Sequence, residues 1–474
     1  MDSSIKRNLI YNFIYQLLIL IIPLITTPYL TRVLGVDGIG DYTYNYSIAT
    51  YFVLFAMLGL SNYGNRTIAG VRDDKELLSQ TFFDIYGMQL ITAGIAIVLY
   101  CIYAVLFRKN IMAYIMLIYV LSSALDISWF FWGMEQFKIT VLRNAFIRVL
   151  SIILIFLLVK DSDDVYIYGL IMTSSTIVSQ LLIWPFLKRF VYFRKPEWKG
   201  IKQHFKPNLI LFVPVIAISL YKTMDKVMLG GMADVSEVGF YECTERIVLV
   251  PVSLVQALGT VMLPRMSNLV ANKREEDGKR YIYLSLLLVS FLSASMSFGI
   301  MGISKDFVPW YYGPGFEKCY DLFLILSPCT IFMAYANVIR TQHLIPMKED
   351  RIYIRSVFLG AIVNLVLNAI LIPHYQSIGA SIGTLLAEAT VCIYQLIKVR
   401  REIDIATPIR RTIPFIVCGG ILFYILDRFE LGITSGTLVI LLKIAIGAIV
   451  YISLCACCYG IRRFVFRRPT ILKA

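Results

Sequence analysis

The stretch from Asn208 to Arg246 reads NLILFVPVIAISLYKTMDKVMLGGMADVSEVGFYECTER, and its pattern decides the fold. An apolar span contains Lys222, Asp225 and Lys226, and a second apolar span follows after a short turn. Charges inside hydrocarbon are costly, so they usually face a protein interior or a water-filled cavity. Lys222 and Lys226 are four residues apart and share one helical face. This face either lines a cavity for an anionic substrate or pairs with acids that hold two helices together.

Apolar runs of similar length recur from one end of the chain to the other. The 474 residues are 58% hydrophobic and 16% charged, and the mean hydropathy is +0.72. Because roughly 20 apolar residues cross a bilayer, these runs predict an all-α polytopic membrane protein with about 14 transmembrane helices. The expected spans lie near residues 9–30, 42–62, 84–107, 111–133, 142–159, 165–187, 208–230, 239–262, 281–303, 320–341, 352–372, 376–397, 410–427 and 436–460.

The distribution of basic residues predicts the orientation. If both termini are cytoplasmic, the segments on that side carry 33 of the 45 Lys and Arg residues, the outer loops carry seven, and five lie within spans. Cytoplasmic loops carry the basic excess in membrane proteins. The net charge of +14 then needs no nucleic acid, because basic loops lie against anionic lipids.

Two similar segments divide the chain into halves. KRNLIYNF begins at Lys6 and precedes RVLGVDGIGDY, while KPNLILF begins at Lys206 and precedes KVMLGGMADVSEVGFY. Six spans separate the two segments, so a duplication would insert both halves the same way round, with substrate held between them; a chance match is the alternative. We expect two six-helix pseudo-symmetric lobes at 1–190 and 208–400, a basic cytoplasmic linker at 191–207, and two C-terminal helices with a basic tail at 401–474.

Five basic residues are the expected lining of a cationic cavity: Arg32, Arg148, Lys222, Lys226 and Arg246. Arg148 and Lys222 are the strongest candidates. For Arg246 the favoured alternative is an ion pair with Glu242, one helical turn before it. Arg32 and Lys443 could instead extend to the membrane surface, as long basic side chains do.

Other polar residues within spans have two interpretations. Asp126, Asp225 and Glu388 are candidates for coupling to a proton or sodium ion, although hydrogen bonding to a neighbouring helix is the commoner use. The amides of Asn45, Asn364 and Asn368 could contact sugar hydroxyls or join helices.

Prolines and aromatic residues mark further features. Proline frees a carbonyl and allows a helix to bend, so four prolines are expected hinges: Pro23, Pro28, Pro214 and Pro251. The run Trp129–Gly133 is expected to form part of an interfacial aromatic belt.

The chain shows no sequence signature of ATP hydrolysis or of a metalloprotease. It contains neither GxxxxGK[ST] nor HExxH. Its nine cysteines lie in apolar segments, and the cluster at Cys455, Cys457 and Cys458 has no histidine or acid nearby. We therefore expect no enzyme activity, no cofactor, no metal site and no disulfide framework.

Five stretches resemble one family. They are PLITTPYLTRVLGVDGIGDY (Pro23–Tyr42), LGLSNYGNRTIA (Leu58–Ala69), DISWFFWGMEQFK (Asp126–Lys138), MDKVMLGGMADVSEVGFYECTERI (Met224–Ile247) and LPRMSNL (Leu263–Leu269). Together they resemble the Wzx-type oligosaccharide flippases of the polysaccharide transporter family, within the superfamily that also holds multidrug extruders and lipid II flippases. Residues at matching motif positions are Arg32, Asp225, Lys226 and Gly230.

The resemblance implies a function as well as a fold. It implies transfer of an undecaprenyl-diphosphate-linked oligosaccharide across the bacterial cytoplasmic membrane, by a monomer, by alternating access, for surface polysaccharide such as O-antigen or capsule. A polysaccharide polymerase and a chain-length regulator are the expected protein partners. The alternatives are a cation-coupled multidrug exporter, a lipid II flippase, or a membrane scaffold for glycan assembly. The basic set argues against cationic drugs, and no arginine triad typical of the lipid II branch is evident.

Overall fold

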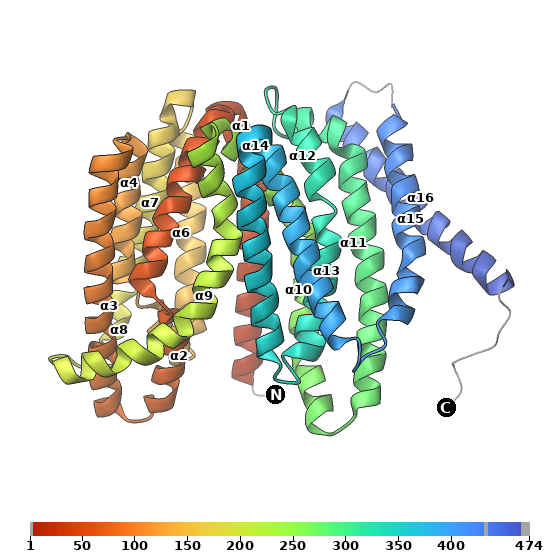
Figure 1. Cartoon of the computed structure of the whole chain (residues 1–474). Coiled ribbons are helices and arrows are strands. Elements are labelled where there is room, and N and C mark those ends of the chain that lie inside the picture. Colours follow the sequence, from red (N-terminus) through yellow and green to blue (C-terminus); the bar gives the residue numbers. More distant parts are fainter. Residues whose placement is uncertain (1–2, 431–434, 466–474) are drawn as a thin grey trace. The chain divides into compact units, whose positions relative to one another are not determined.

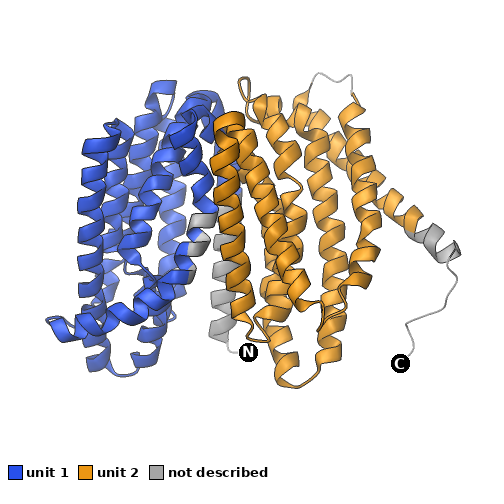
Figure 2. Ribbon diagram, viewed as in Figure 1, with its two compact units in different colours: residues 1–239 blue, residues 240–474 orange. Residues whose placement is uncertain are grey.

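The structure is a computed structural model that describes the backbone of residues 3–430 and 435–465. Side chains are described for 21–458, apart from 214, 217, 218, 220, 221 and 431–434. The elements in the described part are helices, and the chain divides into two compact units, residues 1–239 and 240–474 (Figure 1, Figure 2).

Unit 1 contains nine helices within its described residues, together with three short 3₁₀ or π segments. They are α1 (Ser3–Met57), α2 (Leu60–Val71), α3 (Lys75–Tyr103), η1 (Ala104–Arg108), α4 (Ile111–Ser122), η2 (Ser123–Leu125), α5 (Ser128–Gly133), α6 (Phe137–Leu158), η3 (Ser162–Asp164), α7 (Val165–Leu181), α8 (Trp184–Leu187) and α9 (Trp198–Met232). In this unit α4 packs against α7, α1 against α3, and α2 against α5.

Unit 2 begins inside α10 and contains the remaining elements. They are α10 (Val235–Ala271), α11 (Glu275–Tyr311), α12 (Lys318–Leu326), α13 (Cys329–Ile339), η4 (Arg340–Leu344), α14 (Asp350–Val399), α15 (Ala406–Arg428) and α16 (Gly436–Val465). Here α11 packs against α13, α15 and α16. The predicted lobe boundaries at 190 and 208 stay a prediction.

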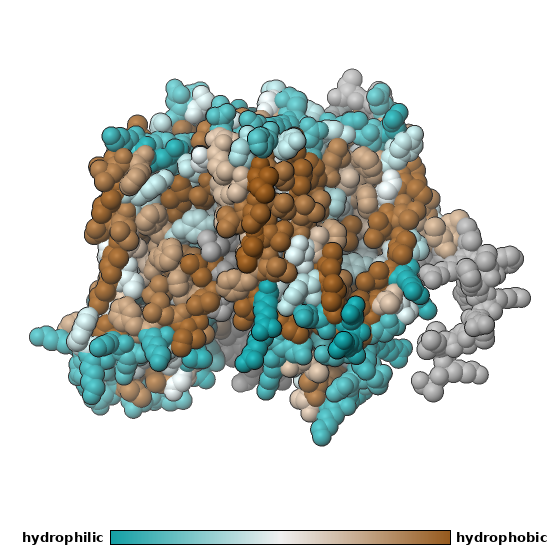
Figure 3. Space-filling model, in the orientation of Figure 1, coloured by the Kyte–Doolittle hydropathy of each residue, from teal (hydrophilic) through white to brown (hydrophobic). Residues whose placement is uncertain are grey.

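Eleven stretches of the described residues are long and apolar enough to cross a membrane. Two of them, Ile21–Val71 and Asp350–Val399, each overlap two predicted spans, and α9 is not among the eleven. In each unit, apolar side chains fill the middle of the visible face and hydrophilic ones gather at the helix ends (Figure 3). The all-α polytopic class is confirmed, whereas the count of about 14 helices stays a prediction.

The helix α14 is two helices joined by a reversal at Gln376, whose φ is +52°. A Cβ at Gly383 would overlap the side-chain oxygen of Asn368. In one straight helix these residues would be about 22 Å apart, so their contact shows that the second half of α14 folds back along the first. The small residues of GASIG therefore permit close packing of the two legs. A similar break interrupts α1 at Gly35, with φ +67°.

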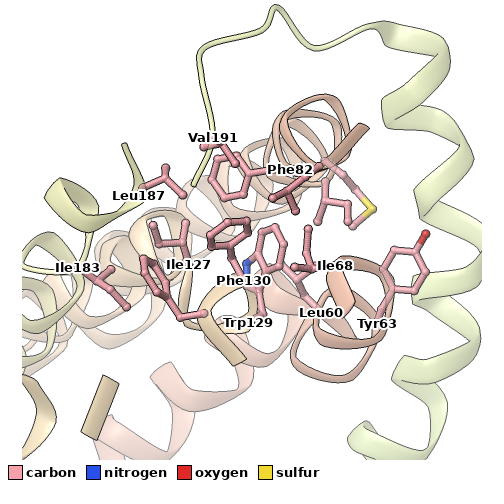
Figure 4. Close-up of a cluster of buried hydrophobic side chains, with 14 of the residues drawn as sticks. Leu60, Tyr63, Ile68, Phe82, Ile127, Trp129, Phe130, Ile183, Leu187 and Val191 are labelled. Atoms are coloured by element: carbon pink, nitrogen blue, oxygen red, sulfur yellow. The ribbon is translucent and has the colours of Figure 1, made fainter. Parts of the chain in front are cut away.

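The aromatic run in α5 forms core, so the expected interfacial belt is wrong for most of it. Trp129, Phe130 and Phe131 are at most 1% exposed, and they pack with residues of α2 and α3 (Figure 4). The Trp129 indole donates a hydrogen bond to Gln89 (3.0 Å), which satisfies its one polar atom inside the core. A Cβ at Gly64 would lie 2.5 Å from the indole, so two of the resemblance stretches, Leu58–Ala69 and Asp126–Lys138, interlock.

The segment before α9 is attached to α3. The Tyr192 amide donates to Ser79 Oγ (3.3 Å), and the Glu197 amide donates to Asp84 Oδ1 (3.0 Å). Asp84 is buried, and a Cβ at Gly200 would overlap it. A carboxylate at a helix N-terminus satisfies an amide that has no partner within the helix. The expected linker at 191–207 therefore includes the first turns of a helix fixed to unit 1.

Candidate functional site

The charges of α9 differ in burial. The Lys222 side chain is exposed, Lys226 is half-buried, and Asp225 is 3% exposed. Asp225 lies close enough to the Tyr51 hydroxyl of α1 for the two groups to interact electrostatically. The Asp225 carboxylate is therefore buried within unit 1, while Lys222, three residues earlier, stays accessible.

The charge of Arg246 is balanced on its own helix. Its Nη2 lies 2.5 Å from Glu242 Oε1, one turn earlier in α10, and the Glu242 side chain is only 13% exposed. This is the ion pair that the i, i+4 spacing favours. Arg246 therefore contributes little net charge to its surroundings, and a role in binding substrate stays a prediction.

The other two predicted cations lie in unit 1. Arg32 is exposed, and its guanidinium donates to the Pro28 carbonyl (2.7 Å) one turn earlier. Arg148 is half-buried on α6. The role of Arg32 and Arg148 in lining a cationic cavity stays a prediction.

The Lys443 side chain could have extended to the membrane surface, but the structure buries it in unit 2. It is 3% exposed, and its Nζ lies 2.5 Å from Asp306 Oδ2 and 3.1 Å from the Leu426 carbonyl. A buried ammonium group is stable only with such partners. Asp306 precedes Lys443 by 137 residues, so this pair could not be predicted from local sequence.

Most of the candidate acids and amides are buried or form hydrogen bonds within the fold. Asp126 accepts the Ser128 amide (2.9 Å) and thus begins α5, while Glu388 is 5% exposed on α14. Asn364 and Asn368 are buried on one face of the first leg of α14, with a 3.3 Å hydrogen bond between them. Their use in joining helices fits the structure, and ion coupling or sugar contact stays a prediction.

Serine in GASIG matches the spacing G-x-S-x-G of hydrolase nucleophiles. However, Ser381 is fully buried within α14, and its hydroxyl donates to the Ser377 carbonyl (2.8 Å). A nucleophilic serine must instead lie exposed on a sharp strand-to-helix turn. The match therefore has no catalytic meaning.

A polar cluster shortly after the break in α1 at Gly35 was missed by sequence reasoning. Asp41 Oδ1 accepts from Asn45 (2.9 Å) and Asn110 (3.1 Å), and it lies 3.8 Å from Arg108 Nη2. The Arg108 guanidinium also stacks over the Tyr44 ring, 4.6 Å from its centroid. Sequence reasoning could not find this cluster, because Asp41 lies far from Arg108 and Asn110 in the sequence.

A second residue missed by sequence reasoning is Arg143. It lies inside α6, half-buried, and donates to Asn144 (2.8 Å), Gln180 (3.3 Å) and Ser128 (3.3 Å). These three hydrogen bonds hold the guanidinium in place between α6, α7 and α5. The available signal was the adjacent polar pair Arg143–Asn144, which lies at the start of a predicted span.

Glycines bring α1 against α9 and the first turn of α10. A Cβ at Gly230 would overlap the Tyr44 ring, and one at Gly40 would overlap the Val235 carbonyl. A Cβ at Gly239 would likewise overlap the carbonyl of Val36. Only glycine permits backbones to approach this closely. The prolines predicted as hinges lie in these same helices: Pro23 and Pro28 in α1, Pro214 in α9 and Pro251 in α10.

Comparisons with known proteins agree with this architecture. A family model described as "Polysaccharide biosynthesis protein" matches residues 5–270. The chain is 23% identical over 405 residues to the "Putative O-antigen transporter" of Escherichia coli (strain K12), covering 84% of this chain and 97% of that one. It is 23% identical over 318 residues to the "Probable low-salt glycan biosynthesis flippase Agl15" of Haloferax volcanii, covering 66% of each.

A solved structure of the lipid II flippase MurJ, in an inward closed conformation, is similar with a TM-score of 0.74. The likeness covers 96% of this chain and 99% of that chain at 15% identity, and it shows the fold alone. The family match contains all five stretches on which the sequence resemblance rests, and it spans more than half of the 474 residues. The chain therefore belongs to the polysaccharide biosynthesis protein family, as the resemblance to polysaccharide transporters predicted.

Proposed function

We propose that the chain is a flippase that moves an undecaprenyl-diphosphate-linked oligosaccharide from the cytoplasmic to the outer leaflet of the bacterial cytoplasmic membrane, for surface polysaccharide synthesis. The observation that carries the proposal is Lys222: its exposed side chain lies in an apolar part of α9 and makes no ion pair with any residue whose side chain is described. The names of the relatives, an O-antigen transporter and a glycan flippase, support the same class of substrate.

The energetic argument concerns where the Lys222 ammonium group can lie. A lysine facing acyl chains at the centre of a helix costs about 2.5–3.5 kcal/mol on insertion scales. A water-filled cavity removes this cost and leaves the charge available to an anion. At an effective dielectric constant of about 20, one such charge attracts a phosphate charge about 4 Å away by roughly 4 kcal/mol.

A lipid-linked diphosphate is the anion that needs such a route. Its charges cannot cross hydrocarbon without compensation, whereas its prenyl tail can stay in the lipid. In this proposal Lys222, Lys226 and Arg148 attract the diphosphate, and two pseudo-symmetric halves expose it to one leaflet at a time. The molecule moves without a bond being broken, so no catalytic residue is assigned.

The proposal is tested in a strain that lacks the gene and carries it on a plasmid. Lys222→Ala and Arg148→Ala should abolish most surface polymer and cause the lipid-linked oligosaccharide to accumulate, while Lys222→Arg should keep part of the export. Lys202→Ala is the matched control, because Lys202 is also an exposed lysine of α9 but lies outside the predicted span.

Normal export in both alanine variants, with normal protein levels, would remove the cationic residues from the mechanism. Surface polymer that stays intact in the deletion strain, with a changed drug susceptibility, would instead favour a drug exporter. Purified protein in vesicles that never translocates a labelled lipid-linked oligosaccharide would indicate a scaffold.

A further inference from the structure

Three side chains meet where the two legs of α14 begin and end. Because α14 reverses at Gln376, the residues before its first turn approach those after its last turn. Glu349 immediately precedes α14, Glu402 follows it closely, and His343 belongs to η4 at the end of α13. Leu344, Val399 and Ile403 of the same segments share one hydrophobic cluster, which fixes the three segments together.

The three side chains offer one ligand atom each at short range. His343 Nε2 lies 2.9 Å from Glu402 Oε2, and the ligand atoms of His343, Glu349 and Glu402 all lie within 4.8 Å of one another. The His343 side chain is 8% exposed, whereas that of Glu402 is 42% exposed. The cluster therefore has a buried imidazole on its inner side and is accessible to solvent at Glu402.

The electrostatic balance of this cluster is incomplete. Glu349 Oε2 is buried and has no hydrogen-bond partner among the described residues. Among the residues whose side chains are described, no lysine or arginine nitrogen lies within 4.0 Å of the Glu349 or Glu402 carboxylate. A proton shared between His343 and Glu402 would satisfy those two side chains and leave Glu349 without a partner. A bound cation would satisfy all three, and buried carboxylate oxygens require such a partner.

We propose that His343, Glu349 and Glu402 bind a divalent transition-metal ion, with Zn²⁺ the best fit. One imidazole nitrogen and two carboxylate oxygens are ligands that Zn²⁺ accepts, at about 2.0–2.2 Å, with water in a fourth position. Ligand atoms of a tetrahedral ion at that distance are roughly 3.3 Å apart. The His343–Glu402 separation of 2.9 Å would therefore need to widen by only a few tenths of an ångström.

This site departs from the sequence expectation of no metal. His343 and Glu402 are 59 residues apart, and no short motif connects them. The ion would clamp the two ends of the α14 hairpin to the end of α13, so its first effect would be on stability. The inference does not depend on the proposed function, because its test measures metal binding and unfolding rather than transport.

The experiment uses the full-length protein, purified in detergent and stripped of metal with a chelator. Zn²⁺ is added in competition with a fluorescent zinc indicator, and the thermal midpoint is recorded with and without Zn²⁺. The variants are Glu349→Gln, Glu402→Gln and His343→Gln. Glu275→Gln is the control, because Glu275 is an exposed carboxylate at the start of α11.

Wild-type protein and Glu275→Gln should bind one equivalent of Zn²⁺, and Zn²⁺ should raise their thermal midpoint. Each ligand variant should weaken binding by at least about 10–100-fold, the loss typical even for residues that only orient a ligand. Binding should release protons and weaken at acid pH, because the ligands must be deprotonated.

Two results would overturn the proposal, and one of them needs no variant. The first is wild-type protein that takes up less than one equivalent of Zn²⁺, or whose thermal midpoint Zn²⁺ does not change. The second is binding as tight in Glu402→Gln as in the control, since Glu402 is the most exposed ligand and its substitution is the least disruptive to folding.

Discussion

Replacing Gly64 with alanine would place a methyl group against the Trp129 indole. The new Cβ would lie 2.5 Å from Cε3 and 2.8 Å from Cδ2 of the ring. Carbon atoms in good contact are about 3.5–4.0 Å apart, so α2 or the indole must move by roughly 1 Å. The indole cannot move freely, because its nitrogen is hydrogen-bonded to Gln89 (3.0 Å) and its ring is at most 1% exposed.

Overpacking of this kind typically costs about 1–3 kcal/mol. Alanine in a helix interior recovers up to about 1 kcal/mol relative to glycine. The net expectation for Gly64→Ala is a loss of about 1–2 kcal/mol in the free energy of unfolding. The measurement is unfolding in mixed micelles of a mild detergent and SDS, followed by fluorescence.

Gly70→Ala is the matched control on the same helix, because no atom lies within 4 Å of the position its Cβ would take. It should leave stability unchanged or raise it slightly. A double-mutant cycle with Trp129→Leu isolates the steric clash: once the ring is removed, Gly64→Ala should cost close to nothing, which corresponds to a coupling of about 1–2 kcal/mol. Full stability of Gly64→Ala, or costs that simply add in the double variant, would refute the proposed interlock.

Three further predictions concern pairs and caps outside α2. Asp306→Ala should destabilise the protein by about 3–5 kcal/mol, because it leaves the buried Lys443 ammonium group without its carboxylate partner, and Lys443→Met with Asp306→Leu should recover much of the loss in the same unfolding assay. Hydrogen bonds from the Thr407 side chain and amide lower the pKa of Asp404, so its contribution to stability is full above the ordinary value of 3.8 and is lost as the pH falls through the folded value. The thermal midpoint of Asp404→Asn should therefore lie below that of wild type at pH 6, and the difference should shrink as the pH falls below 3.8; equal midpoints at pH 6 would contradict this. Asn110→Ala removes the acceptor for the Met112 amide (3.0 Å) at the start of α4 and a donor to Asp41, and should cost about 1–2 kcal/mol; an unchanged unfolding curve would show that neither bond contributes.

The sequence predicted the fold class because that class depends on the length and recurrence of apolar runs. The reversal at Gln376 was also visible as a boundary between two expected spans at 372–376. The aromatic run at Trp129 was assigned to the membrane interface because amphipathic aromatics concentrate there. Its burial depends on Gly64 and Gln89, which lie far away in the sequence and leave room and a hydrogen-bond acceptor for the indole.

Prediction of the candidate site was limited by partners distant in sequence. The Arg246–Glu242 pair could be anticipated, because its four-residue spacing on a helix is local information. Lys443–Asp306, Arg108–Asp41 and His343–Glu402 could not, because each joins segments that only the folded chain brings together. The side of the membrane on which each residue lies stays a prediction.

The hydrogen bonds between α3 and the segment before α9 determine where the chain can be cut or a tag inserted. The basic composition of this segment and Pro196 suggest a loose tether into which a tag or a gene split could be introduced. Yet the amides of Tyr192 and Glu197 are bound to α3, and a break there would detach the capping carboxylate of Asp84 from the helix it begins. The exposed turn at 272–274, between α10 and α11, is the better place for a cleavage site or for two co-expressed fragments.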